Sequence, residues 1–85
     1  MSRDVMHLKD IIPDGLLDCF GLACPMPIYK TATVMKGMQP GQVLEVRADE
    51  DGIEKDMPAW CKATGNEYLG LLRENGEYRV FVKKK

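Results

Sequence analysis

One cysteine in this 85-residue chain stands in a setting that suits thiol chemistry. Cys24 lies in the run Gly21-Leu22-Ala23-Cys24-Pro25-Met26-Pro27, between an apolar segment and a stretch with helical spacing. The free N–H groups and the positive dipole end of a helix start favour a thiolate. Pro25 and Pro27 have a backbone φ near the helical value and stiffen the first turn. We therefore expect Cys24 to be an exposed nucleophile that can attack or hold a sulfane sulfur.

The position of Cys24 alone leaves two interpretations open. A free cysteine in a protein is commonly a small buried hydrophobe, and a helix start specifies no reaction. Pro25 and Pro27 have no N–H, so backbone donors to the sulfur would come from neighbours such as Met26 and Ile28. The residues themselves are thus compatible with a functional thiol and with a structural one.

The other two cysteines are expected to pack in the core. Cys19 falls on the inner face of the first expected strand, and Cys61 falls on the apolar face of the second expected helix. Cys19 as a resolving thiol for Cys24 is the alternative, although their separation could exceed the roughly 5.5–6 Å Cα spacing of a disulfide. The chain has no Cys-x-x-Cys pair, and His7 is its one histidine. We therefore expect neither a metal nor a cofactor.

The elements that position these residues follow from hydrophobic periodicity. Alternating apolar and polar residues predict strands over 15–21, 43–48, 67–73 and 77–83. Helical spacing predicts helices over 25–38 and from about Met57 to the residue before Gly65. Pro58 disfavours a helix interior, so an irregular turn is expected before Met57, with Asp56 as the cap. Asn75-Gly76 predicts a hairpin between the last two strands.

The resulting order, β-α-β-α-β-β, predicts an α/β fold. The first two strands should be parallel through a right-handed crossover, and the last two antiparallel. Each helix has one apolar face, so both helices should pack on one face of a mixed four-stranded sheet. This is a two-layer α/β sandwich. Residues 14–85 are expected to form its single domain, and residues 1–13, which show no period, a flexible N-terminal tail.

The composition limits which classes of partner and which cellular compartment are expected. A net charge of −1 and a pI of about 5.8 argue against direct binding of nucleic acid, which needs a positive field. An odd cysteine count without a signal peptide or a membrane-spanning run indicates a cytoplasmic protein with no membrane contact. We expect a monomer. The acidic run Asp49-Glu50-Asp51 is expected to be a solvated turn, with a basic partner as the alternative.

The run LDCFGLACPMP, from Leu17 to Pro27, resembles the signature of the TusA/SirA-like sulfur-carrier family. The Cys-Pro-x-Pro run alone would be a moderate signal, and the accompanying residues make it specific. Those residues are Asp18, Gly21, Pro25, Pro27 and Asp56. The likeness extends to the C-terminus through Met38-Gln39-Pro40-Gly41, Ala48-Asp49, Asp56-Met57-Pro58 and Trp60-Cys61.

This resemblance implies a role for Cys24. The cysteine would accept a sulfane sulfur as a persulfide from a cysteine desulfurase or a rhodanese-like donor, and pass it to a downstream acceptor protein. Within the family such sulfur goes to tRNA thiolation, molybdenum cofactor or sulfur oxidation. The alternatives are a non-catalytic regulatory or protein-interaction module of the same fold, and a carrier linked to selenium metabolism.

Three residues depart from the family pattern. Ala23 stands where many members have a basic residue, Met26 where an acidic residue is common, and Glu50 where a second aspartate is frequent. Without a cation beside Cys24, stabilisation of the thiolate is left to the helix start.

Overall fold

The computed structural model describes residues 11–23 and 25–85; Cys24 and residues 1–10, which contain His7 and most of the expected tail, lie outside the described residues. The observed order of elements is the predicted one, β-α-β-α-β-β. Its elements are β1 (Gly15–Asp18), α1 (Met26–Lys36), β2 (Val43–Ala48), α2 (Ile53–Thr64), β3 (Glu67–Glu74) and β4 (Glu77–Lys83). No helix in the described part of the chain is long and apolar enough to span a membrane.

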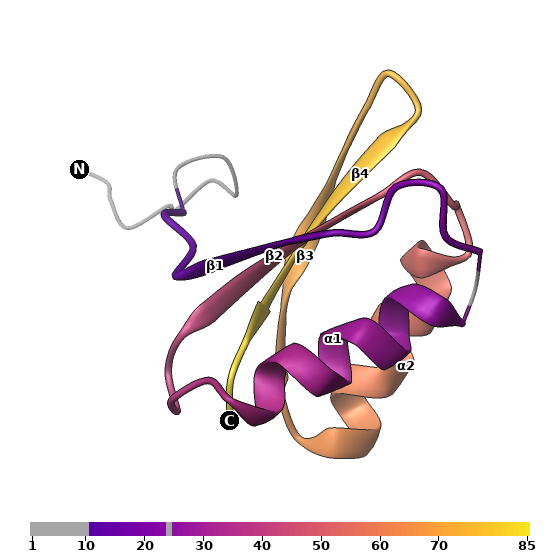
Figure 1. Ribbon diagram of the computed structural model, residues 1–85. Coiled ribbons are helices and arrows are strands. Elements are labelled where there is room, and N and C mark those ends of the chain that lie inside the picture. The colour runs from indigo at the N-terminus through magenta and orange to yellow at the C-terminus, as the bar shows by residue number, and fades with distance from the viewer. Residues whose placement is uncertain (1–10, 24) are drawn as a thin grey trace.

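The four strands form one mixed sheet in the order β1-β2-β4-β3. β1 pairs with β2 in parallel, whereas β4 lies antiparallel to both β2 and β3. Both helices cover the same face of the sheet, so the two-layer sandwich is confirmed (Figure 1). The predicted hairpin is also confirmed, since Asn75 and Gly76 both have positive φ, 52° and 78°, as a tight turn of this kind requires.

The core lies between the sheet and the helices. The two central strands, β2 and β4, supply the sheet side, with Leu44, Val46, Ala48, Val80 and Val82 fully buried. Buried side chains of α1 and α2 meet them, among them Met35, Ile53, Met57 and Cys61. Cys19 and Cys61 belong to this cluster, which confirms their predicted core positions.

The start of α2 differs from the sequence prediction, which placed it at about Met57. The helix begins at Ile53 and continues through Pro58, and Gly52, not Asp56, is its N-cap. The first turn is tight, because the N–H groups of Ile53 and Glu54 donate to carbonyls only three residues back. Burial of Ile53 in the core holds this turn in place, so the helix tolerates a proline that local propensity excludes.

The elements on either side of Cys24 are shorter than expected. β1 ends at Asp18 and not at residue 21, because the chain turns at Gly21, whose φ is 79°. α1 runs over Met26–Lys36, not 25–38, with Pro25 as its N-cap and Gly37 as its C-cap. Its buried residues are Pro27, Thr31 and Met35, and the Thr31 hydroxyl donates to the Pro27 carbonyl (2.7 Å). The loop that contains the motif is therefore longer than the sequence indicated.

The uncovered face of the sheet carries a buried ion pair. Glu45 is 2% exposed, and its Oε2 accepts hydrogen bonds from Arg47 Nε (2.7 Å) and Arg79 Nε (2.9 Å). Burial alone would raise the pKa of Glu45, but the hydrogen bonds and charges of the two arginines outweigh it and lower that pKa. The carboxylate therefore stays ionised between the two central strands.

Replacing Cys61 by alanine should destabilise the fold without touching the motif loop. The thiol is 2% exposed, and trimming a small buried side chain costs on the order of 1 kcal/mol. Urea unfolding at neutral pH measures this loss. An unchanged free energy of unfolding would contradict the core role of Cys61.

Candidate functional site

The parallel pairing of β1 and β2 places the segments that follow them at one edge of the sheet. The N–H of Gly21, after β1, donates to both carboxylate oxygens of Asp49, after β2, at 3.1 and 3.2 Å. Asp49 is therefore not merely part of a solvated acidic turn, as the sequence suggested. The sequence did contain one signal for this role: Asp49 directly follows a buried strand, and parallel strands end at the same edge of the sheet.

The loop after β1 is held by its own hydrogen bonds as well. The carboxylate of Asp18 accepts the Phe20 N–H (3.0 Å), and the Cys19 carbonyl accepts the Leu22 N–H (3.2 Å). Gly21 sits between them with a φ that side chains rarely adopt. Asp18 thus caps backbone groups, the interpretation that the sequence favoured, and Gly21 supplies the turn.

The start of α1 leaves few backbone donors free. Met26 N–H donates to the Ala23 carbonyl (2.9 Å), and Ile28 and Tyr29 N–H both donate to the Pro25 carbonyl (3.0 and 3.2 Å). The expectation that Met26 and Ile28 could donate to a sulfur is therefore wrong. The backbone satisfies these groups itself. The positive end of the helix dipole is what remains for a nearby anion.

Pro27 and Asp56 are brought together, although they are far apart in the sequence. Pro27 is buried and, with Ile28, lies against Ile53 and Asp56 of α2 and Glu50 just before it, with no room for a water molecule between them. Asp56 is half-buried in the first turn of α2. The motif residues of α1 thus rest directly on the start of α2.

Cys24 lies outside the described residues, and its neighbours Ala23 and Pro25 are both exposed. The two described thiols are unlike an exposed nucleophile. Cys19 is fully buried; burial raises its pKa, partly offset by the charge of Lys30, with Asp18 adding to the rise. Burial raises the pKa of Cys61 to about 11. Within residues 11–23 and 25–85 no three His, Cys, Asp or Glu side chains gather to hold a metal.

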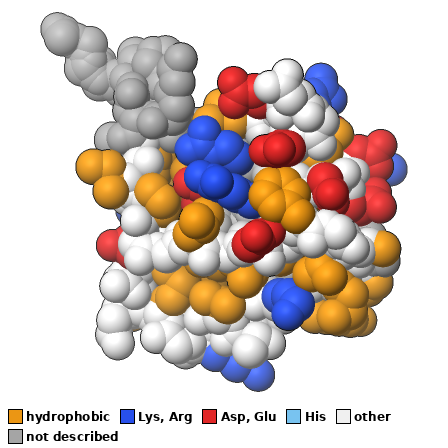
Figure 2. Space-filling model, turned by 45° about the horizontal axis from the view of Figure 1, so that its top comes forward, with side chains coloured by type: hydrophobic (Ala, Val, Ile, Leu, Met, Phe, Trp, Pro, Cys, Tyr) orange, Lys and Arg blue, Asp and Glu red, His pale blue; other side chains and the backbone are white. Residues whose placement is uncertain are grey.

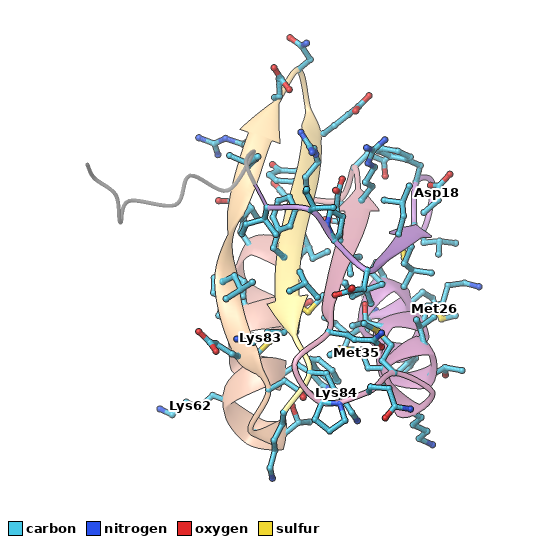
Figure 3. The ribbon with its side chains drawn as sticks, turned by 90° about the vertical axis from the view of Figure 1, so that its left-hand side faces the viewer. Asp18, Met26, Met35, Lys62, Lys83 and Lys84 are labelled. Atoms are coloured by element: carbon cyan, nitrogen blue, oxygen red, sulfur yellow. The ribbon has the colours of Figure 1, made fainter. Side chains whose placement is uncertain are left out.

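An apolar surface flanks the motif along α1 and β1. A groove of about 300 Å³ is lined by Leu17, Met26, Tyr29, Lys30, Thr33 and Val34. Met26 is 43% exposed and Tyr29 61%. Figure 3 places the labelled Asp18, at the end of β1, and Met26, at the start of α1, on the same side of the molecule. Met26 and Tyr29 thus expose apolar surface beside the motif.

Comparison with known families gives a consistent result. The family model for sulfurtransferase TusA matches residues 16–84. The sulfur carrier protein TusA of Allochromatium vinosum is 41% identical over 71 residues, which cover 84% of this chain and 93% of that protein. A SirA-like protein from Desulfitobacterium hafniense has the same fold, with a TM-score of 0.71 at 21% identity, covering 81% of this chain and 95% of that one.

Longer relatives are also similar. The putative sulfur carrier protein YrkF of Bacillus subtilis is 49% identical over 69 residues, which cover 81% of this chain. This chain spans 37% of the length of YrkF, and 39% of a putative sulfur carrier protein of Aquifex aeolicus to which it is 36% identical.

Removing the Asp49 carboxylate should loosen the motif loop. In Asp49→Ala the Gly21 amide loses its acceptor, so its hydrogen exchange should accelerate, and stability should fall by about 1 kcal/mol at this exposed site. Asp51→Ala is the matched control, since Asp51 is an exposed carboxylate of the same turn. Equal effects of the two substitutions on the Gly21 amide would show that the contact does not hold the loop.

Alkaline pH should destabilise the protein through its buried thiols. The folded state holds the Cys61 proton more tightly than the unfolded state, whose thiol pKa is near 9.0. This contribution to stability is complete below the unfolded pKa and is lost as the pH rises through about 11. The raised pKa of Tyr68, also caused chiefly by burial, acts in the same direction. We expect the free energy of unfolding to fall less steeply with pH in Cys61→Ala than in the parent protein. Identical slopes in the two proteins would contradict the contribution of the Cys61 thiol.

Proposed function

Because this chain belongs to the TusA sulfurtransferase family, we propose that it carries a sulfane sulfur as a persulfide on Cys24. The observation that carries this proposal is the construction of the loop around that residue. Asp49 holds the loop on one side, and the proline-capped start of α1 holds it on the other. Ala23 and Pro25, the two sequence neighbours of Cys24, are both exposed, which supports a thiol that partner proteins can reach.

The proposed transfer is a thiol exchange. The Cys24 thiolate attacks the outer sulfur of a donor persulfide, R–S–SH. A new S–S bond forms on Cys24, the S–S bond of the donor breaks, and the donor leaves as a thiolate. An acceptor thiolate then attacks the outer sulfur on Cys24 and restores the cysteine. Each step moves one sulfur and one proton between thiols, and it needs no outside oxidant or reductant.

The properties of Cys19 and Cys61 support the assignment of the sulfur to Cys24 alone. A thiolate is the reactive form, and burial makes that form costly at Cys19 and Cys61. Cys61 lies in α2 against the core, remote in the sequence from the motif. A redox pair of Cys19 with Cys24 would require the fully buried Cys19 sulfur to become accessible. The observations therefore favour a carrier with one working thiol over a dithiol.

A carrier of this family works between a donor protein and an acceptor protein. For this chain we propose a cysteine desulfurase or a rhodanese-like protein as donor, a downstream protein as acceptor, and a monomer acting in the cytoplasm without direct contact with nucleic acid. The exposed apolar groove beside Met26 supports protein partners. Sulfur destined for tRNA thiolation, molybdenum cofactor or sulfur oxidation would use the same chemistry, as would selenium.

Replacing Cys24 by serine should abolish sulfur loading and leave the fold intact. Mass spectrometry of the intact protein after treatment with inorganic polysulfide should show one added sulfur on the parent protein and none on Cys24→Ser. Cys61→Ala is the control, because it changes a buried thiol and should load normally.

Other outcomes separate the alternatives. Undiminished loading of Cys24→Ser would overturn the assignment of the thiol. A parent protein that never gains sulfur would favour the interaction module. A loss of two hydrogens that is reversed by reduction would favour a Cys19–Cys24 redox pair.

A further inference from the structure

A hollow lies at the end of the molecule opposite the motif loop, between the last turns of the helices and the C-terminal residues. Its volume is about 410 Å³. Its floor includes Met35 and Trp60, and its rim includes Asn66 and three lysines, Lys36, Lys84 and Lys85. α1 has 11 residues, so its two ends are about 16 Å apart at 1.5 Å per residue. The hollow is therefore a separate surface from the motif loop.

The rim is held in shape by hydrogen bonds of the backbone and of the Asn66 side chain. Lys85 N–H donates to Asn66 Oδ1 (2.9 Å), and the Asn66 amide donates to Thr64 Oγ1 (2.9 Å). Lys84 pairs with the turn before β2, donating to the Gln42 carbonyl (2.7 Å) and accepting from Gly41 N–H (2.9 Å). Such pre-organisation lowers the entropy cost of binding.

The lysines of the rim are not neutralised by the described residues. Within residues 11–23 and 25–85, the ion pairs involve Glu45 and Glu54, and none includes Lys36, Lys84 or Lys85. Figure 3 places labelled Lys62, Lys83 and Lys84 at the same end as Met35, away from Asp18.

Among the described residues, Asp14 and Glu67 bring carboxylates toward this end. Asp14 accepts the Val43 N–H, and Glu67 stands opposite Lys83 in the sheet. A lysine in the last turn of a helix stabilises the helix dipole, which suffices to explain Lys36. It does not explain Lys84 and Lys85, which follow β4.

We propose that this hollow docks an acidic segment of a partner protein, with an apolar side chain against Trp60 and its carboxylates on the lysines. Charge complementarity identifies the occupant, because an aromatic side chain beside lysines that no described residue neutralises suits an acidic, partly apolar peptide.

A nucleic acid is disfavoured. The chain has a net charge of −1, and the opposite end carries Asp18, Asp49 and Asp51, which would repel an extended polyanion. On the face in Figure 2, acidic side chains lie among basic and hydrophobic ones, so this face offers no continuous positive surface. The occupant is therefore a short anionic segment, held at this end alone.

Trp60 makes the proposal directly measurable, because it is the one tryptophan of the chain and lies in the hollow. A short synthetic peptide of glutamates around one leucine, titrated into the full chain at low salt, should change Trp60 emission saturably. Added salt should weaken this binding. In Lys36→Gln/Lys84→Gln the affinity should fall about fivefold, as expected for the loss of two exposed ion pairs.

Lys55→Gln/Arg73→Gln is the matched control, since it removes the same charge from two exposed residues that do not line the hollow. Its affinity should stay within about twofold of the parent value. No saturable change in the parent protein, or equal weakening in both double variants, would overturn the proposal. Tighter binding of an oligothymidylate than of the peptide would instead make the surface a nucleic-acid site. Sulfur loading of Cys24, measured on the same samples, is independent of every one of these outcomes.

Discussion

The parallel pairing of β1 with β2 is the constraint on which the site depends. Leu17 lies beside Val46 and Asp18 beside Arg47, so both strands point the same way and end at the same edge. An antiparallel pair would have put Gly21 and Asp49 at opposite ends of the sheet. In the parallel arrangement these residues, 28 apart in the sequence, share a hydrogen bond. The crossover helix α1 must also begin at that edge, which brings the whole motif to one place.

The buried carboxylate of Glu45 helps to hold β2 in its place in the sheet. β2 lies between β1 and β4, and Glu45 on β2 holds Arg79 on β4. A slip of one residue would turn Glu45 into the apolar core and leave its charge unpaired, which is strongly unfavourable. Glu45 thus contributes to the register of the central strands. Because Asp49 directly follows β2, this register also sets the position of Asp49. The role of Glu45 is positional and does not require a large net gain in stability.

Elements that carry their own pattern could be predicted from the sequence, and those fixed by distant contacts could not. β2 and β4 match their predicted bounds, because their alternation and the Asn75-Gly76 turn are local signals. The start of α2 was placed too late, since burial of Ile53 overrides the local effect of Pro58. In the site, the motif around Cys24 could be recognised from the sequence. The position of Asp49 after a strand was visible too, but its partner Gly21 is 28 residues away and is set by the strand pairing.

The backbone N–H groups at the start of α1 already have hydrogen-bond acceptors. This has a consequence for a sulfur carrier, which exists with and without a bound sulfur atom. The Met26, Ile28 and Tyr29 N–H groups already have acceptors within the chain, and Pro25 and Pro27 have no N–H to offer. A sulfur atom arriving at the neighbouring residue would neither make nor break these bonds. If Cys24 carries the sulfur as proposed, we expect the described backbone at the start of α1 to be the same in both states. A partner would then recognise the added sulfur itself, and not a rearrangement of these hydrogen bonds.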